Sequence, residues 1–111
     1  MKVNVSVDYS KFSDEKLVIK AQHVEDKMEG NTNFPAPVAS LTKMVAAKED
    51  FIIKLAACKG GSMDETLAKK KARELLLETL RDLGLYVQVN CKNDLSIAQS
   101  SGFKTGKVKE T

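Results

Sequence analysis

Hydrophobic residues recur at helical spacing in three stretches of this chain, and the first stretch follows a short extended N-terminus. Ser13 is well placed to cap a helix, Asp14 and Glu15 suit its first turn, and Gly30 suits its end. Four apolar residues then stand at i, i+4, i+7 and i+11, which is one face of a helix. These residues are Leu17, Ala21, Val24 and Met28.

The second stretch comes after "NTNFPAPVAS", where two prolines, Asn, Thr and Ser favour an irregular connection. We expect Ser40 to cap a helix that runs through Lys59 and ends at Gly60-Gly61. The apolar face expected to be buried comprises Leu41, Met44, Val45, Ile52 and Leu55.

The third stretch begins with "SMDE", in which Ser62 and Glu65 form a capping box. A helix that ends in Gly-Gly next to one that starts with a capping box predicts an antiparallel helical hairpin. We expect this third helix to continue to about Cys91. Its predicted core face comprises Ala68, Ala72, Leu75, Leu76 and Leu83.

The end of the third helix has an alternative interpretation. Leu85, Val87 and Val89 alternate as they would in a strand, and the N-terminal segment from Val3 to Tyr9 alternates in the same way. A two-stranded ribbon between these segments is therefore an alternative. The helix is preferred, because Gly84 is the only turn signal and an isolated ribbon is marginally stable.

A short fourth helix is expected over "LSIAQSS", capped by Asn93 or Asp94 and closed by Gly102, with Phe103 folding back. After it, only Val108 is apolar, which predicts a tail or linker over 104–111. The predicted fold is all-α: a small bundle with a helical hairpin, a long third helix, a short fourth helix and an extended N-terminal segment, in one domain over 1–103.

The composition is that of an ordinary globular domain, since 42% of the 111 residues are hydrophobic and 30% are charged. No apolar run approaches the roughly 20 residues that span a bilayer. The N-terminal residues lack the apolar block of a signal peptide. We therefore expect a cytoplasmic protein without a membrane partner.

The run Lys69-Lys70-Lys71-Ala72-Arg73 is the strongest cluster of charge and suggests nucleic-acid binding. On a helix, however, the three lysines point to three different sides. Lys70 and Glu74 stand at i, i+4, and Glu78 and Arg81 at i, i+3, as on a solvated helix face. Nucleic-acid binding is therefore the alternative function, and a solvated face is preferred.

Catalytic and metal-binding patterns are absent from the sequence. Cys58 and Cys91 stand apart, with no second thiol or histidine at ligand spacing, and His23 has no nearby Cys or Ser that would form a nucleophile pair. We therefore expect two reduced thiols, no cofactor, no metal and no enzymatic activity.

The third helix carries apolar residues outside its core face. Leu77, Leu80, Leu85 and Val89 form the candidate interaction surface. It would dock a second copy of the chain, giving a homo-oligomer, or another protein. The alternative is that other segments of the same chain cover these residues.

Three segments, "AQHVEDKMEGNTNFPAPVASL", "ARELLLETLRDLGLYVQ" and "SSGF", resemble the N-terminal helical domain of a group of largely uncharacterised bacterial proteins. The resemblance covers Met1 to Phe103. In many of these proteins a fibronectin type III module follows, which implies that 104–111 is a linker. The resemblance implies no catalytic or ligand residue. The sequence as a whole predicts a non-catalytic structural or protein-interaction module.

Overall fold

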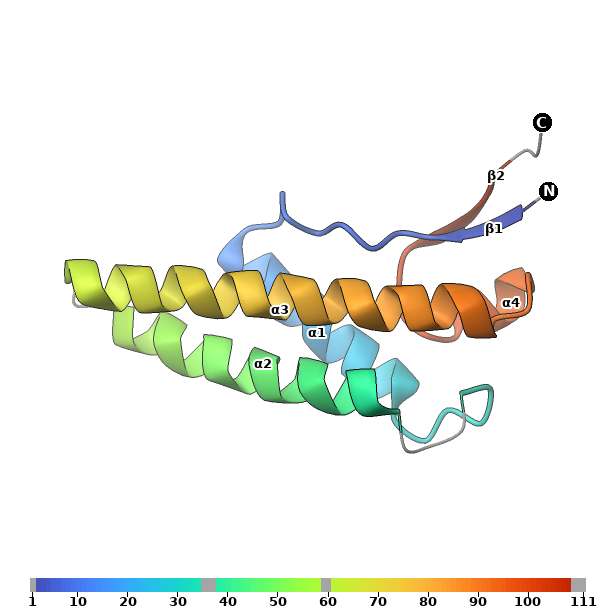
Figure 1. The fold of residues 1–111 in the computed structure, drawn as a ribbon, viewed down its shortest axis with the longest axis horizontal. Helices are drawn as coiled ribbons and strands as arrows, with labels where there is room; N and C mark the ends of the chain where they lie inside the picture. Colours follow the sequence, from blue (N-terminus) through green and yellow to red (C-terminus); the bar gives the residue numbers. More distant parts are fainter. Residues whose placement is uncertain (1, 35–37, 59–60, 109–111) are drawn as a thin grey trace.

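A computed structural model describes residues 2–34, 38–58 and 61–108 of the chain. It confirms the predicted all-α bundle and adds one small antiparallel sheet (Figure 1). The elements in chain order are β1 (Lys2–Val5), α1 (Asp14–Met28), α2 (Ala39–Ala57), α3 (Met63–Asn90), α4 (Leu95–Gln99) and β2 (Thr105–Val108).

Helix α1 forms as its sequence predicts. The Ser13 side chain accepts a hydrogen bond from the Lys16 amide, and Gly30 follows the helix with a φ of 69°. That left-handed conformation ends the helix and favours glycine. All four residues of the predicted face are buried, so this prediction is confirmed: Leu17, Ala21, Val24 and Met28.

Helices α2 and α3 run side by side in opposite directions and form the predicted hairpin (Figure 1). The Ser62 hydroxyl accepts a hydrogen bond from the Glu65 amide at 3.1 Å and caps α3. The predicted cap of α2 is wrong: the N-cap is Val38, and its carbonyl accepts from the Leu41 and Thr42 amides. Lys59 and Gly60, where α2 was predicted to end, lie outside the described residues.

The buried face of α2 differs from the predicted one. Met44 is buried as expected, but Ile52 is 41% exposed, whereas Lys48 and Phe51 are buried. Lys48 reaches the interior because it pairs with Glu25 of α1. The pattern of apolar positions could not predict this buried residue, because lysine counts as a polar position.

The buried face of α3 also departs from the prediction at two leucines. Leu75 is 48% exposed, whereas Leu80, expected outside the core face, is fully buried. Helix α3 is in contact with both α2 and the N-terminal segment, so a wider arc of its surface is covered than one apolar stripe indicates. The buried residues of α3 are Ala72, Leu76, Thr79, Leu80, Leu83, Gly84 and Val87.

Residues 85–89 are helical, which confirms the preferred interpretation of this segment. The N-terminal strand of the alternative does exist, but it pairs with β2, so that Lys2 lies opposite Val108 and Val5 opposite Thr105. Residues 105–108 are therefore a strand, and the expectation of a tail or linker is corrected there. Composition missed β2 because backbone hydrogen bonds, rather than apolar side chains, hold a short edge strand.

Gly84 lies where β1's continuation crosses α3, and it does not break the helix. A Cβ at Gly84 would lie 2.6 Å from a methyl carbon of Val7, closer than real Cβ atoms approach. The missing side chain therefore lets the N-terminal segment pack directly on α3. Gly84 counted against the helical prediction because glycine favours turns. In the structure it is instead the position at which the N-terminal segment packs on α3.

Helix α4 and the turn that follows it form as the sequence predicts. The Asp94 carboxylate accepts hydrogen bonds from the Ser96 and Ile97 amides, which settles the choice between the two expected caps. Gly102 follows with a φ of 85°, and Phe103 folds back into the core with 4% of its surface exposed.

Candidate interaction surfaces

The four residues of the predicted interaction surface do not form one surface. Leu80 is fully buried, so its assignment to an interface is wrong. Leu77 is partly buried under the N-terminal segment. Leu85 and Val89 are 47% and 78% exposed and remain accessible. The chain itself covers half of the predicted surface, as the alternative interpretation proposed.

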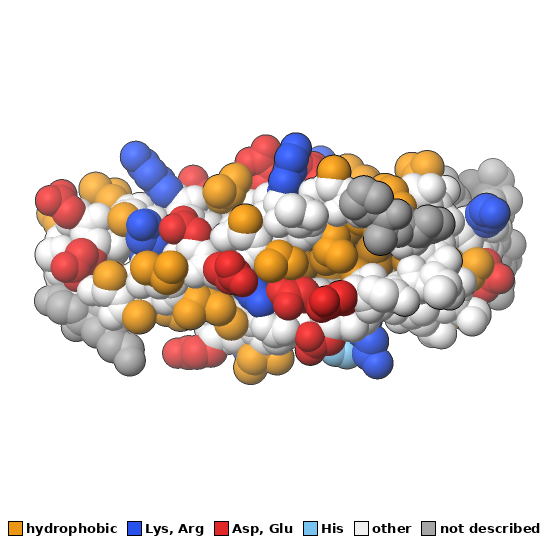
Figure 2. Space-filling model, turned by 90° about the horizontal axis from the view of Figure 1, so that it is seen from below, with side chains coloured by type: hydrophobic (Ala, Val, Ile, Leu, Met, Phe, Trp, Pro, Cys, Tyr) orange, Lys and Arg blue, Asp and Glu red, His pale blue; other side chains and the backbone are white. Residues whose placement is uncertain are grey.

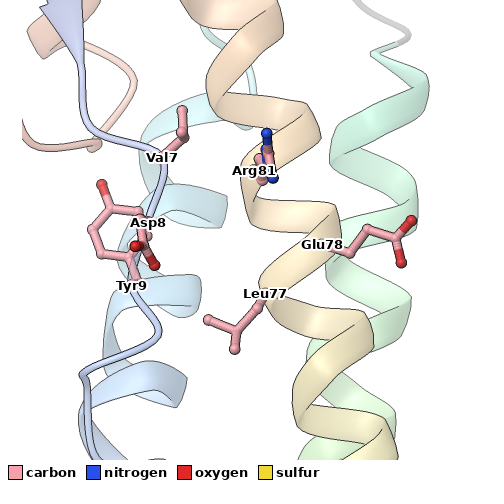
Figure 3. A pocket seen from close by; sticks show the side chains of 6 residues that line it. All are labelled: Val7, Asp8, Tyr9, Leu77, Glu78 and Arg81. Carbon is pink, nitrogen blue, oxygen red and sulfur yellow. The ribbon is translucent and has the colours of Figure 1, made fainter.

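Leu77 lines a groove of about 500 Å³ between α3 and the N-terminal segment. Figure 3 shows Val7, Asp8 and Tyr9 on one wall, with Leu77 pointing toward them and Glu78 pointing away. Hydrogen bonds from Ser10 lower the pKa of the Asp8 carboxyl below its usual value. The groove is open to solvent, and its lining combines apolar residues with the charged residues Asp8, Glu78 and Arg81.

Exposed apolar side chains gather instead on the half of the molecule that holds the hairpin turn. Seen from below, Figure 2 shows hydrophobic side chains on the surface of this half, interspersed with charged ones. We call the exposed large apolar residues of α2 and α3 in this half the hairpin surface. Its members are Ile52, Ile53, Met63, Leu67 and Leu75. Ile52 and Leu75 were predicted from the sequence to lie in the core, and no role was predicted for the other three.

Met63 and Leu67 of the hairpin surface are exposed because α1 does not reach them. Asp14, the first residue of α1, lies beside Lys69 and Arg73 of α3, so the residues from Met63 to Ala68 extend past the start of α1 (Figure 1). Two helices alone leave both sides of their contact open to solvent. A short first helix beside a long hairpin is the sequence signal that could have identified this surface.

The lysine run is partly a structural element. Lys69 and Arg73 hold the Asp14 carboxylate at 3.1 and 3.0 Å, and Arg73 also donates to the carbonyl oxygens of Ser10 and Phe12. These contacts fasten the start of α1 to α3. Lys70 and Lys71 are exposed.

The two ion pairs expected on α3 do not form. Among the ion pairs of the described residues, none joins Lys70 to Glu74 or Glu78 to Arg81. The charges that do pair on α3 reach across to α1 instead of along their own helix. The run is thus neither the purely solvated face we expected nor a free cationic patch.

A buried charge pair lies between α1 and α2. The Lys48 ammonium is 2.6 Å from a Glu25 carboxylate oxygen and 2.7 Å from the Gln22 amide oxygen. The two charged side chains are 6% and 19% exposed. Such a pair fixes how two helices meet, because leaving either charge unpaired in the interior is costly.

A second groove, of about 600 Å³, lies between α1, the N-terminal segment and the α4–β2 corner. Lys20 lies within it, donates to the Gly102 carbonyl at 2.7 Å and sits 5.5 Å from the centre of the Tyr9 ring. Burial, together with the positive charge of Lys104, lowers the pKa of the Lys20 ammonium. Burial raises the pKa of the Tyr9 hydroxyl, which donates to the Ser6 carbonyl.

The two cysteines lie apart from any group that could hold a metal ion in the described structure. Cys58 and Cys91 are both free thiols, and Cys91 is buried. Within residues 2–34, 38–58 and 61–108, no three His, Cys, Asp or Glu side chains are grouped to hold a metal ion. None of the described helices is both long enough and apolar enough to span a membrane.

Comparison with known protein families, with curated proteins and with solved structures finds no match to this chain.

Proposed function

We propose that the chain is a non-catalytic interaction module that forms a homodimer through the hairpin surface. The observation that supports this proposal is the concentration of exposed isoleucine, leucine and methionine on one half of the hairpin. Soluble proteins rarely leave large apolar side chains grouped without a partner. Two copies of a helical hairpin can cover such residues by packing into a four-helix bundle.

The charges around Leu67 favour a second copy as the partner. In an antiparallel contact of two α3 helices centred on Leu67, residues before it on one copy lie level with residues after it on the other, and the twofold axis keeps each residue on its own flank of the contact. Asp64 of one copy would then lie close to Lys71 of the other, because both lie on the same flank of Leu67, and both residues are exposed. Each copy would supply one acid and one base, so a symmetric dimer gains two complementary pairs.

Light scattering coupled to size exclusion, over a range of protein concentrations, tests the proposal. The natural sequence should shift from monomer to dimer mass as concentration rises, and Leu67→Glu should stay monomeric. Val89→Glu is the matched control, because Val89 is exposed at the far end of the same helix. The Val89→Glu variant should dimerise like the natural sequence. If Val89→Glu is monomeric and Leu67→Glu is not, the interface lies at Leu85 and Val89 instead of at the hairpin surface.

A charge exchange tests the identity of the partner. Asp64→Lys and Lys71→Asp should each weaken the dimer, because each places like charges across the contact. The variant with both changes should recover dimerisation. A monomer at every concentration, or a double variant no better than the single ones, would overturn the homodimer.

The proposed place of action is the cytoplasm, supported by two cysteines that stay as free thiols. Nucleic-acid binding remains the weaker alternative. Lys69 and Arg73, two cations of the lysine run, are already engaged by Asp14. The remaining cations of the run are interspersed with acids on a helix of balanced charge.

A further inference from the structure

Helix α1 is divided into an acidic and a basic side. At 100° per residue, its basic side chains fall within an arc of roughly 60°, and its acidic ones lie outside that arc. The basic side comprises Lys16, Lys20, His23 and Lys27, and the acidic residues are Asp14, Glu15, Glu25 and Asp26. Positive charge is therefore collected along one side of a helix.

The basic side of α1 forms one wall of the 600 Å³ groove. Lys20 and His23 of α1 line the groove. The rest of its lining includes Tyr9 and Phe12 of the N-terminal segment and Lys104, which directly precedes β2. Its volume falls within the range of sites that bind small molecules. Two ammonium groups and an imidazole thus face one hollow on the surface.

Gly102 brings the two halves of this groove together. A Cβ at Gly102 would lie 3.2 Å from the His23 carbonyl and 3.1 Å from the Lys27 side chain. The φ of 85° and this close approach both favour glycine. The α4–β2 corner can therefore lie against α1, within reach of the Lys20 ammonium.

The cations of this groove have no carboxylate partner. Within the part of the chain that the structure describes, ion pairs involve Lys48, Lys54, Lys69 and Arg73, and none involves Lys20 or Lys104. The lowered pKa of Lys20 has burial as its first cause and Lys104 as its second. Two like charges are held near each other, so a bound anion would relieve their repulsion.

We propose that this groove binds a small molecule bearing a phosphate group, with Lys20, Lys104 and His23 as its contacts. A phosphate carries close to two negative charges and several acceptor oxygens, which matches two ammonium groups and an imidazole better than a single carboxylate does. Asp8 also lines the groove. Its carboxylate disfavours a long polyanion that would extend beyond the groove.

Titration of the full chain with inorganic phosphate and with pyrophosphate, followed by two-dimensional NMR, tests the site. Saturable shifts should centre on residues that line the groove. Lys104→Gln, a change at an exposed residue, should keep the fold and weaken binding several-fold. Lys20→Gln with Lys104→Gln should weaken it by tenfold or more. Lys43→Gln with Lys92→Gln removes the same charge from exposed positions outside the groove and should bind like the natural sequence.

Three results would overturn the proposal. The first is the absence of saturable shifts with either anion. The second is an equal loss of binding in the groove and control double variants, which would indicate general charge attraction. The third is binding of single-stranded DNA, steeply dependent on salt, without binding of either small anion; that outcome would favour the nucleic-acid alternative.

Discussion

At one end of the molecule, strand β1 lies between β2 and the last turns of α3; at the other end, α2 and α3 extend beyond α1 as a two-helix arm (Figure 1). The sheet end buries Val3, Val5 and Phe103 almost completely. The hairpin end leaves Leu67 and Met63 52% and 80% exposed. The number of segments that meet at each end accounts for this difference.

The hydrogen bonds and ion pairs also differ between the two ends of the molecule. At the sheet end, the Gln88 side chain accepts from the Val5 amide at 2.6 Å and donates to the Val3 carbonyl at 2.7 Å, and Asn93 accepts from the Val3 amide. These side chains occupy the edge of β1 that β2 leaves open. At the hairpin end, the ion pair of Lys54 and Asp50 is about half exposed. These contacts indicate that the open edge of β1 is covered within one chain, whereas the hairpin end has room for a partner.

The largest expected effect separates two leucines of the same helix. Leu80→Ala should lower the free energy of unfolding by about 3 kcal/mol, because Leu80 is fully buried and the shorter side chain leaves a cavity in the core. Leu67→Ala should change it by less than about 0.5 kcal/mol in the monomer. Urea unfolding at low, fixed protein concentration measures both. Equal losses would mean that the hairpin end is packed as tightly as the rest.

The sequence predicted the helices well because their ends carry local signals. Ser13 and Ser62 cap α1 and α3 as expected, and Gly102 ends the corner after α4. Each of these helix ends depends on a few neighbouring residues, so it can be predicted from the sequence without knowledge of the fold. The face of α1 was also predictable, since a short helix packed on one side has one apolar stripe.

The sheet and the surfaces were less predictable because they depend on distant residues. Nothing local to Thr105 shows that Val5 pairs with it, and nothing local to Leu80 shows that it lies in the core. Gly84 was interpreted as a turn signal because Val7, the residue that fills its missing side chain, lies far away in the sequence. The basic side of α1 is visible in the sequence, but the groove beside it requires Lys104 and Gly102 to be placed.

A second contrast lies between two lysines of α2. Lys48→Met should cost about 2 kcal/mol, because it leaves the Glu25 carboxylate mostly buried without its cation. Lys54→Met removes an exposed pair and should cost less than about 0.5 kcal/mol. Thermal and urea unfolding check both values. Lys48→Met combined with Glu25→Met should recover part of the loss, and a further loss would show that the charges act separately.

The smallest expected effect concerns the edge of β1. Gln88→Ala removes the hydrogen bonds to the Val5 amide and the Val3 carbonyl, and should cost about 1 kcal/mol because water can replace part of them. Amide hydrogen exchange at Val5 should become faster, whereas exchange in α2 should not change. Gln99→Ala is the matched control, since its exposed side chain lies outside the strand edge. If exchange at Val5 is as fast in the control as in Gln88→Ala, the glutamine does not protect the edge, and the sheet end depends on side-chain packing alone.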